Sequence, residues 1–383
     1  MSKLINVAAA FLLLASNTYA HHSSAPHYDH NNRIELIGTY TEMKYVNPHA
    51  YIYFDVDEEG TTNSWRCELS AASTLTRRGW SADMFTEGQK LTIAGSPARR
   101  EDNVCFLNTL QLEDGTTISR NQDITGLLTN LTEASAETSA PKAPREKTLS
   151  NGQPNLSGAW VSRSFGRNGQ GIRPNYQPTD AGKLAAADYD IAYDDPIIQC
   201  HYLNLINGWN HDVNINEISQ TDDAVTLQYG FMDVVRTIHL NISEHPTDLE
   251  PSATGHSIGH WENNTLVVDT IGFEAGILNH NNGLSHSDQM HVVERFHVND
   301  KDQLIRDYRV TDPRYLEGVT QGQDIQAMSE KGYQPYNCVE LSGDNNIRPE
   351  EIEAREARAA EEAAPAPTST TPPAEKPWWQ LWD

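Results

Sequence analysis

The chain has few basic residues and no long apolar run. Its 383 residues include 28 Lys and Arg against 53 Asp and Glu, which gives a formal net charge of −25. Nucleic-acid binding depends on cations that neutralise phosphates, so this deficit argues against a nucleic-acid partner. The apolar run from Leu4 to Ala15 is too short to cross a bilayer as a helix, and no later run is long enough. We therefore expect neither a nucleic-acid partner nor a transmembrane segment.

Several motifs of known chemistry are also missing from the sequence. There is no Cys-x-x-Cys pair, which argues against a thioredoxin-like redox site and against a zinc ribbon. There is no Gly-x-Ser-x-Gly elbow, no phosphate-binding loop and no dinucleotide fingerprint. The stretch Ser285-His286-Ser287-Asp288 contains the residue types of a catalytic triad, but adjacency in sequence does not make a triad. The motifs in the sequence therefore do not point to any particular catalysed reaction.

The first twenty residues, 1–20, predict a secretory signal peptide. Lys3 precedes the apolar run, and Thr18 and Ala20 provide the small residues that precede a cleavage site. Cleavage after Ala20 would make His21 the N-terminus of the mature protein. The sequence thus predicts a periplasmic or secreted protein in an oxidising compartment.

The four cysteines agree with export. An even number of cysteines in an exported chain predicts disulfides, and four allow three pairings. The expected domain boundaries favour one bridge in each domain, and four buried thiols are the alternative. The residues concerned are Cys67, Cys105, Cys200 and Cys338, paired as Cys67–Cys105 and Cys200–Cys338.

Residues 21–125 predict an OB-like β domain. Alternating apolar residues and turn signals indicate three strands, a helix and then two strands, which is the element order of an OB barrel. In that topology the third and fifth strands are neighbours, so Cys67 and Cys105 can meet. The expected strands cover 34–40, 50–56, 62–69, 90–95 and 104–112, with the helix in 71–85 and a break near Gly79.

A second all-β domain is expected in residues 156–345, after a flexible linker at 126–155. Regularly spaced short strands and tight turns indicate an antiparallel meander. Seven or eight such strands would close into a lipocalin-like barrel, which can hold one small ligand, and a sandwich is the alternative. The expected strands cover 217–221, 224–229, 234–241, 255–262, 265–273, 291–298 and 303–311.

The last segment, 346–383, predicts an acidic helix followed by a disordered tail. The Pro-, Thr- and Ala-rich part cannot bury a core. The chain then ends in an aromatic cluster, Trp378, Trp379 and Trp382. Exposed tryptophans of this kind favour a docking peptide. Packing of the tail back onto the barrel is the alternative.

Two ordered strings of residues resemble known families. The first contains His21-His22-Ser23, Asn47-Pro48-His49 and Arg78-Gly79-Trp80. The second contains Gly255-His256-Ser257-Ile258-Gly259, Trp261-Glu262 and Leu266-Val267-Val268-Asp269-Thr270. The first resembles a bacterial exported domain-of-unknown-function family, and the second resembles another set of exported β proteins. The resemblance implies a two-domain exported protein and transfers no activity.

A copper site is one hypothesis for the N-terminal region. Five of the fifteen histidines fall between residues 21 and 49. If His21 is the N-terminus, its amine and imidazole can chelate one metal ion, and His49 would supply a third nitrogen. Neutral imidazoles suit copper. The alternative is a histidine-rich arm and a structural histidine in a turn.

The second domain contains six candidate ligand-binding residues. Asp269 and Glu294 interrupt apolar strands, and we expect both to point into the barrel, where a carboxylate needs a partner. The leading hypothesis is a binding protein for a small, partly apolar molecule. An isomerase, hydratase or hydrolase that uses the same groups is the alternative, and a structural ion-pair network is another. The candidates are Arg236, His256, Asp269, His286, Glu294 and Arg306.

Overall fold

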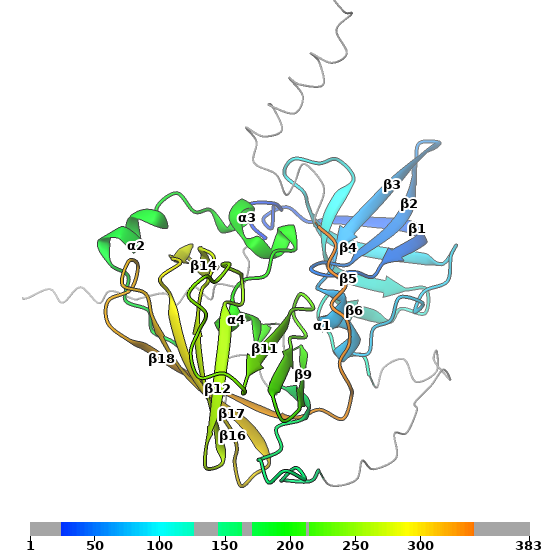
Figure 1. Ribbon diagram of the computed structural model, residues 1–383. Coiled ribbons are helices and arrows are strands. Elements are labelled where there is room, and N and C mark those ends of the chain that lie inside the picture. Colours follow the sequence, from blue (N-terminus) through cyan, green and yellow to red (C-terminus); the bar gives the residue numbers. More distant parts are fainter. Residues whose placement is uncertain (1–23, 126–144, 163–170, 212–213, 341–383) are drawn as a thin grey trace, which may run out of the picture.

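The computed structural model describes residues 24–125, 145–162, 171–211 and 214–340 (Figure 1). The predicted signal peptide, His21 and the tail tryptophans Trp378, Trp379 and Trp382 lie outside the described residues. Strands make up 44% of the described residues and helices 9%, so the prediction of an all-β protein is confirmed. In the described part, no helix is both long enough and apolar enough to cross a membrane.

The first barrel closes in the strand order of an OB fold, as predicted. Its sheet has the order β3-β2-β1-β4-β5-β6, and a parallel β3–β5 pairing closes five of these strands into a barrel. Cys67 and Cys105 are register partners in that pairing and form a disulfide. The elements are β1 (Ile34–Lys44), β2 (Tyr51–Glu58), β3 (Thr61–Glu68), α1 (Ala72–Arg77), β4 (Lys90–Pro97), β5 (Val104–Leu112) and β6 (Thr117–Ser119).

The expected helix of this barrel is shorter than the sequence pattern suggested. Helix α1 ends at Arg77, and Gly79 adopts a φ of +83°. A Cβ atom on Gly79 would also lie 2.9 Å from the backbone of Thr125. Only glycine fits such a position, which is why the chain turns there. The strand faces follow the predicted alternation, with Ile52 and Phe54 fully buried in β2.

The second barrel has nine strands, so the expected number of seven or eight was too low. The nine strands follow the order β17-β16-β13-β12-β11-β10-β9-β7-β18, which a β17–β18 pairing closes, and the short β8 pairs with β18 outside this ring. All neighbours in the barrel are antiparallel except β11 and β12. The strands are β7 (Gly158–Val161), β8 (Gly171–Ile172), β9 (Ile215–Gln220), β10 (Ala224–Gln228), β11 (Val235–His239), β12 (His256–Glu262), β13 (Thr265–Ile271), β16 (His291–Val298), β17 (Gln303–Thr311) and β18 (Thr320–Met328).

Strand β18 was missed because its inward positions are not apolar. Gly322, Asp324 and Gln326 face the barrel interior, and all three are buried. A strand with polar residues on its inner face lacks the alternation that marks a half-buried strand. The closing strand is therefore visible only in the folded barrel.

Short helices and a two-stranded ribbon lie at one end of the second barrel (Figure 1). Asn204 caps α4 by accepting from the backbone N–H groups of Ile206 and Asn207, and its amide donates to carbonyls of the ribbon. Arg306 donates to the carbonyls of Leu205 and Ile206, so α4 is tied to the barrel interior. These elements are α2 (Asp180–Ala185), α3 (Ile191–Asp194), η1 (Pro196–Gln199), α4 (Leu205–Gly208), β14 (Gly276–Asn279) and β15 (Leu284–His286).

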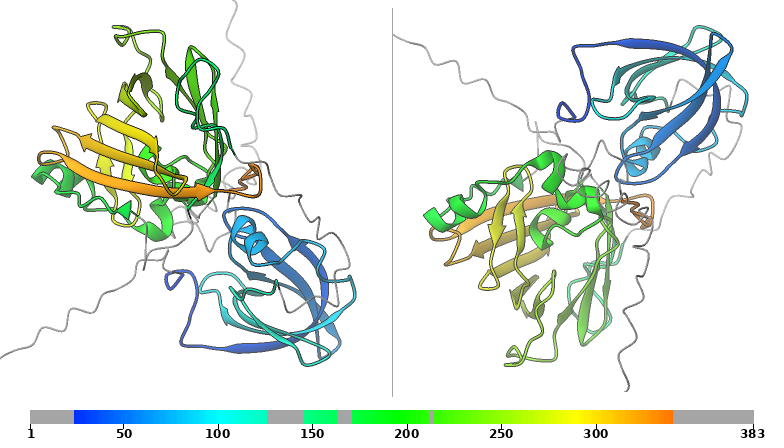
Figure 2. Two further views of the ribbon diagram at one scale, coloured as in Figure 1. Left: turned by 90° about the horizontal axis from the view of Figure 1, so that it is seen from below. Right: turned by 90° about the horizontal axis from the view of Figure 1, so that it is seen from above.

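The segment that follows β18 contacts the first barrel (Figure 2). The backbone N–H of Val339 donates to the carbonyl of Asn47 at 2.7 Å, and the Asn47 amide donates to the carbonyl of Tyr336. Cys338, within this segment, forms a disulfide with Cys200. The second predicted pairing is thus confirmed, and it fixes the segment that contacts the first barrel.

Candidate functional site

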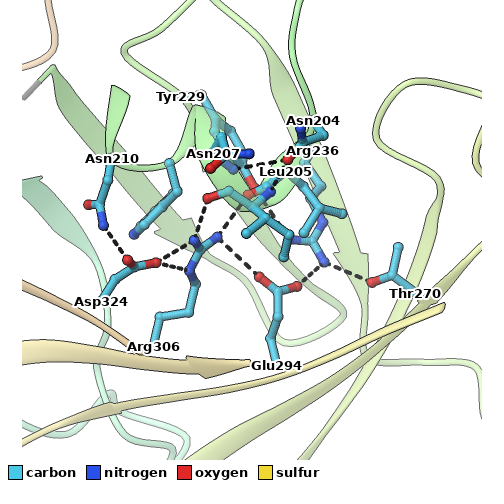
Figure 3. Close-up of polar contacts among 12 residues, drawn as sticks. Asn204, Leu205, Asn207, Asn210, Tyr229, Arg236, Thr270, Glu294, Arg306 and Asp324 are labelled. Carbon is cyan, nitrogen blue, oxygen red and sulfur yellow. Dashed lines mark hydrogen bonds and ion pairs between the residues drawn. The ribbon is translucent and has the colours of Figure 1, made fainter. Parts of the chain in front are cut away.

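Three of the six candidate residues meet in the centre of the second barrel (Figure 3). Arg236, Glu294 and Arg306 are at most 1% exposed. The Glu294 carboxylate lies 2.5 Å from Arg236 Nη2 and 3.4 Å from Arg306 Nη1. Arg306 also donates through Nε to Asp324, at 2.7 Å. Sequence reasoning placed Glu294 on the inner face correctly and missed Asp324, whose strand it did not recognise.

The remaining donors of this network are also bonded. Arg236 donates to Ser257 Oγ at 2.9 Å and to Thr270 Oγ1 at 2.8 Å. Burial raises the pKa of Asp324, and the neighbouring Arg306 opposes that rise. Two guanidinium groups therefore face two carboxyl groups inside the barrel. This arrangement supports the structural interpretation, because the charged groups bond to one another, to hydroxyl side chains and to the backbone.

Asp269 lies on the outer face of the barrel, so the expectation that it points inward was wrong. Its strand turns Leu266, Val268 and Thr270 toward the core, and all three are fully buried. The Asp269 side chain is 41% exposed. The apolar residues on both sides of this strand hid the correct face. His256 also lies on the outer face, so neither residue joins the central network.

Asp269 instead belongs to a group of histidines. Its carboxylate accepts from His245 Nε2 at 3.0 Å and from His291 Nε2 at 2.9 Å. His256 Nδ1 lies 2.8 Å from His245 Nδ1. Burial lowers the pKa of His256, and the nearby rings of His245 and His239 lower it further. Sequence reasoning missed His239, His245 and His291, because only the pairing of the strands brings them to Asp269.

His286 is buried at the end of the barrel and is separate from the central network. It is 3% exposed, packs edge-on against Phe273 and has its pKa lowered by burial. The adjacent Ser287 donates through Oγ to Asp312 at 2.9 Å, and Asp312 also accepts from the backbone of this turn. The Ser285-His286-Ser287-Asp288 stretch is therefore a turn that hydrogen bonds to Asp312 hold in place.

In the first barrel, His49 contacts a buried carboxylate. Its Nδ1 lies 2.9 Å from Glu68 Oε1, and Tyr28 donates its hydroxyl to Glu68 Oε2 at 2.8 Å. Burial raises the pKa of Glu68, but His49, Arg120 and Tyr28 outweigh it and hold the pKa at about 2. Among the described residues, no group of three or more His, Cys, Asp or Glu is placed to hold a metal ion. The copper hypothesis for His21 and His49 stays a prediction, since His21 lies outside them.

We expect the stability of the first barrel to fall in acid because of Glu68. The ordinary pKa is 4.5 and the folded pKa is about 2, so this carboxylate stabilises the fold above pH 4.5 and loses that effect as the pH falls toward 2. The shift corresponds to about 3 kcal/mol. Urea unfolding of Glu68→Gln at pH 5 and pH 2.5 should show a much smaller difference than the wild type. Glu58→Gln, at an exposed end of β2, should behave like the wild type.

A pocket of about 370 Å³ lies where α2 packs near the β14–β15 ribbon. Tyr176 and Leu284 provide apolar surface, and Asn279, Asn282 and Lys183 provide polar groups. Burial raises the pKa of Tyr176, so its hydroxyl stays protonated. That hydroxyl is buried and has no hydrogen-bond partner among the described residues. Sequence reasoning missed this pocket, because its lining comes from short elements and loops that are far apart in the sequence and carry no motif.

Comparison with known proteins gives a family match for the N-terminal part of the chain. Residues 10–105 match the model of a family of unknown function, DUF6152. The resemblance of the first string of residues to such a family is thereby confirmed. The match ends at Cys105, so the second barrel lies outside it. No curated protein sequence matches the chain.

Two solved structures show weak similarity. A mutant of the fluorescent protein UnaG is 15% identical with a TM-score of 0.22, and the match covers 46% of this chain and 97% of that one. The ZRD-deleted mutant of TiaS, in complex with agmatine, is 15% identical with a TM-score of 0.19. That match covers 25% of this chain, which spans 28% of the TiaS chain. The pairing of the strands defines the fold of both barrels.

Proposed function

We propose that the protein is exported and that its second barrel binds a small, partly apolar molecule in the pocket beside α2. The predicted signal peptide at 1–20 and the two disulfides support export, since disulfides persist in oxidising compartments. We also propose the domain limits expected above, 21–125 and 156–345. The binding pocket differs from the site expected from sequence, whose charged residues fill the barrel centre.

The size and lining of the pocket support this proposal. Small-molecule sites usually have volumes of roughly 300–1,000 Å³ and combine apolar walls with a few polar groups. The pocket has about 370 Å³ and contains Leu284 beside the amides of Asn279 and Asn282. Such a lining fits a molecule with an apolar body and a few hydrogen-bonding groups.

The observation that carries the proposal is the pocket itself, whose volume of about 370 Å³ and mixed apolar and amide lining suit a small molecule. Tyr176 lines the pocket, and its hydroxyl has no partner among the described residues. The charges of Arg306 and Asp324 act on that hydroxyl, so it lies toward the barrel centre, and the pocket offers the ring of Tyr176 as apolar surface.

The lining favours binding over catalysis. Proton transfer needs a titratable side chain within reach of the substrate, most often His, Glu or Asp. The described residues that line the pocket include none of these three types. Lys183 is present but forms an ion pair with Asp180 at 2.9 Å. The alternative of an isomerase, hydratase or hydrolase therefore has less support than a binding protein.

A fluorescent probe tests the proposal. We expect the full-length protein to bind one equivalent of 8-anilinonaphthalene-1-sulfonate, an amphipathic anion, in this pocket. Ala186→Phe places a ring among the lining residues and should weaken binding at least tenfold. Ala185→Phe, on the exposed side of the same helix, should leave it unchanged. Equal binding by both variants, with unchanged thermal unfolding, would contradict the proposal.

A further inference from the structure

Four neighbouring strands bring histidines to one patch on the outer face of the second barrel. The order β11-β12-β13-β16 places His239, His256, Asp269 and His291 on adjacent strands. Asp269 pairs with Ile258, two residues after His256, and with Val293, two residues after His291. Side chains two residues apart share a face, so all three point outward together. His245, from the connection between β11 and β12, completes this outer histidine cluster.

Two ring nitrogens in the outer histidine cluster face each other. His245 Nδ1 and His256 Nδ1 are 2.8 Å apart. His239 stacks on His256 with ring centres 5.2 Å apart and an interplanar angle of 15°. Thus three imidazoles meet in a small volume, and the side chain of His245 is only 13% exposed.

Asp269 fixes the orientation of His245. Its carboxylate accepts from Nε2–H of His245 at 3.0 Å, so the neutral ring carries its lone pair on Nδ1. That lone pair points toward His256 Nδ1. The same carboxylate accepts from His291 Nε2 on its other side at 2.9 Å. Metal-binding histidines usually donate one ring N–H to a carboxylate and carry the lone pair that binds the metal on the other nitrogen.

We propose that His245 Nδ1 and His256 Nδ1 bind a divalent transition-metal ion, with Asp269 as the positioning residue. Imidazole nitrogens suit Zn²⁺, Cu²⁺ and Ni²⁺. In a tetrahedral Zn²⁺ site two such nitrogens lie ~3.3 Å apart, so the rings need to separate by about 0.5 Å. Solvent fills the remaining coordination positions of the metal ion, or His239 fills one of them after its ring turns.

The negative charge of the protein favours a bound metal cation between the two facing nitrogens over a shared proton alone. The chain carries a formal net charge of −25, which raises the local concentration of cations at its surface. Metal binding displaces the proton that the two facing nitrogens share, and this proton passes to His256 Nε2, so the ring stays neutral. None of these residues lines the pocket beside α2, so this site is independent of the proposed ligand-binding function.

Isothermal titration of the full-length protein with Zn²⁺, at pH 7.5 and without a histidine tag, tests the site. We expect His256→Ala to lose one equivalent that the wild type binds. Asp269→Asn should retain the site with affinity reduced roughly 10–100-fold, since it removes only the positioning carboxylate. His260→Ala is the matched control, because His260 lies on the same strand and face but pairs with Glu262.

Two outcomes separate a metal site from a hydrogen-bonded pair. The N-terminal histidines are the same in every variant, so any Zn²⁺ bound there cancels in the comparison. If His256→Ala binds as many equivalents as the wild type and with the same affinity, the proposal is overturned and the two rings only share a proton. A visible d–d absorption band with Co²⁺ in the wild type, absent in His256→Ala, would support the proposal.

Discussion

Glu294→Ala is expected to destabilise the second barrel by about 3–5 kcal/mol, because it leaves buried guanidinium charge without its counter-ion. Glu294 is fully buried and joins Arg236 to Arg306. Among the described residues, its removal leaves Arg236 with the hydroxyl groups of Ser257, Thr270 and Tyr229 as its partners. Urea unfolding followed by tryptophan fluorescence measures the loss, since Trp209 packs over Arg306.

An exposed ion pair on the same barrel provides the control. Glu262 accepts from Arg295 Nη2 at 2.8 Å, and both side chains are close to half exposed. Water screens such a pair, so Glu262→Ala should leave the unfolding midpoint almost unchanged. Equal effects of the two substitutions would show that the central network does not stabilise the barrel.

Replacing Cys200 and Cys338 together with alanine is expected to destabilise the second barrel by about 5 kcal/mol. In the chain-entropy model a disulfide restricts the unfolded chain, and the effect grows with the length of the closed loop. This bridge joins residues 138 positions apart. The same change should weaken the contact with the first barrel, because the bridge holds the segment around Val339 against Asn47. Differential scanning calorimetry of the double variant measures both effects.

The other disulfide provides a matched comparison. Cys67–Cys105 joins residues 38 positions apart, which corresponds to about 4 kcal/mol in the same model. Its removal should lower the unfolding temperature of the first barrel and leave that of the second barrel in place. If removing either bridge lowers the unfolding temperatures of both barrels equally, the two barrels unfold as one unit. In that case the prediction that each bridge stabilises its own barrel is wrong.

The sequence determined the features that depend on local pattern. Alternation within each strand and the order of strands and helix predicted the OB-like barrel, and neighbouring third and fifth strands predicted Cys67–Cys105. In β16, Glu294 stands between Val292 and Phe296, two residues away from each. Residues so spaced share a face of a strand, so the sequence assigned Glu294 to the core.

Only the tertiary structure decided what depends on pairing between distant segments. Val267 and Val268 are both apolar, so both faces of strand β13 carry apolar side chains. The alternation of side chains therefore could not show which face is inside the barrel, and Asp269 was assigned to the wrong face. The polar inner side of β18 hid the ninth strand together with Asp324. The pocket beside α2 and the outer histidine cluster join residues from separate strands and loops. Their proximity follows from register and closure of the barrel, which no local period encodes.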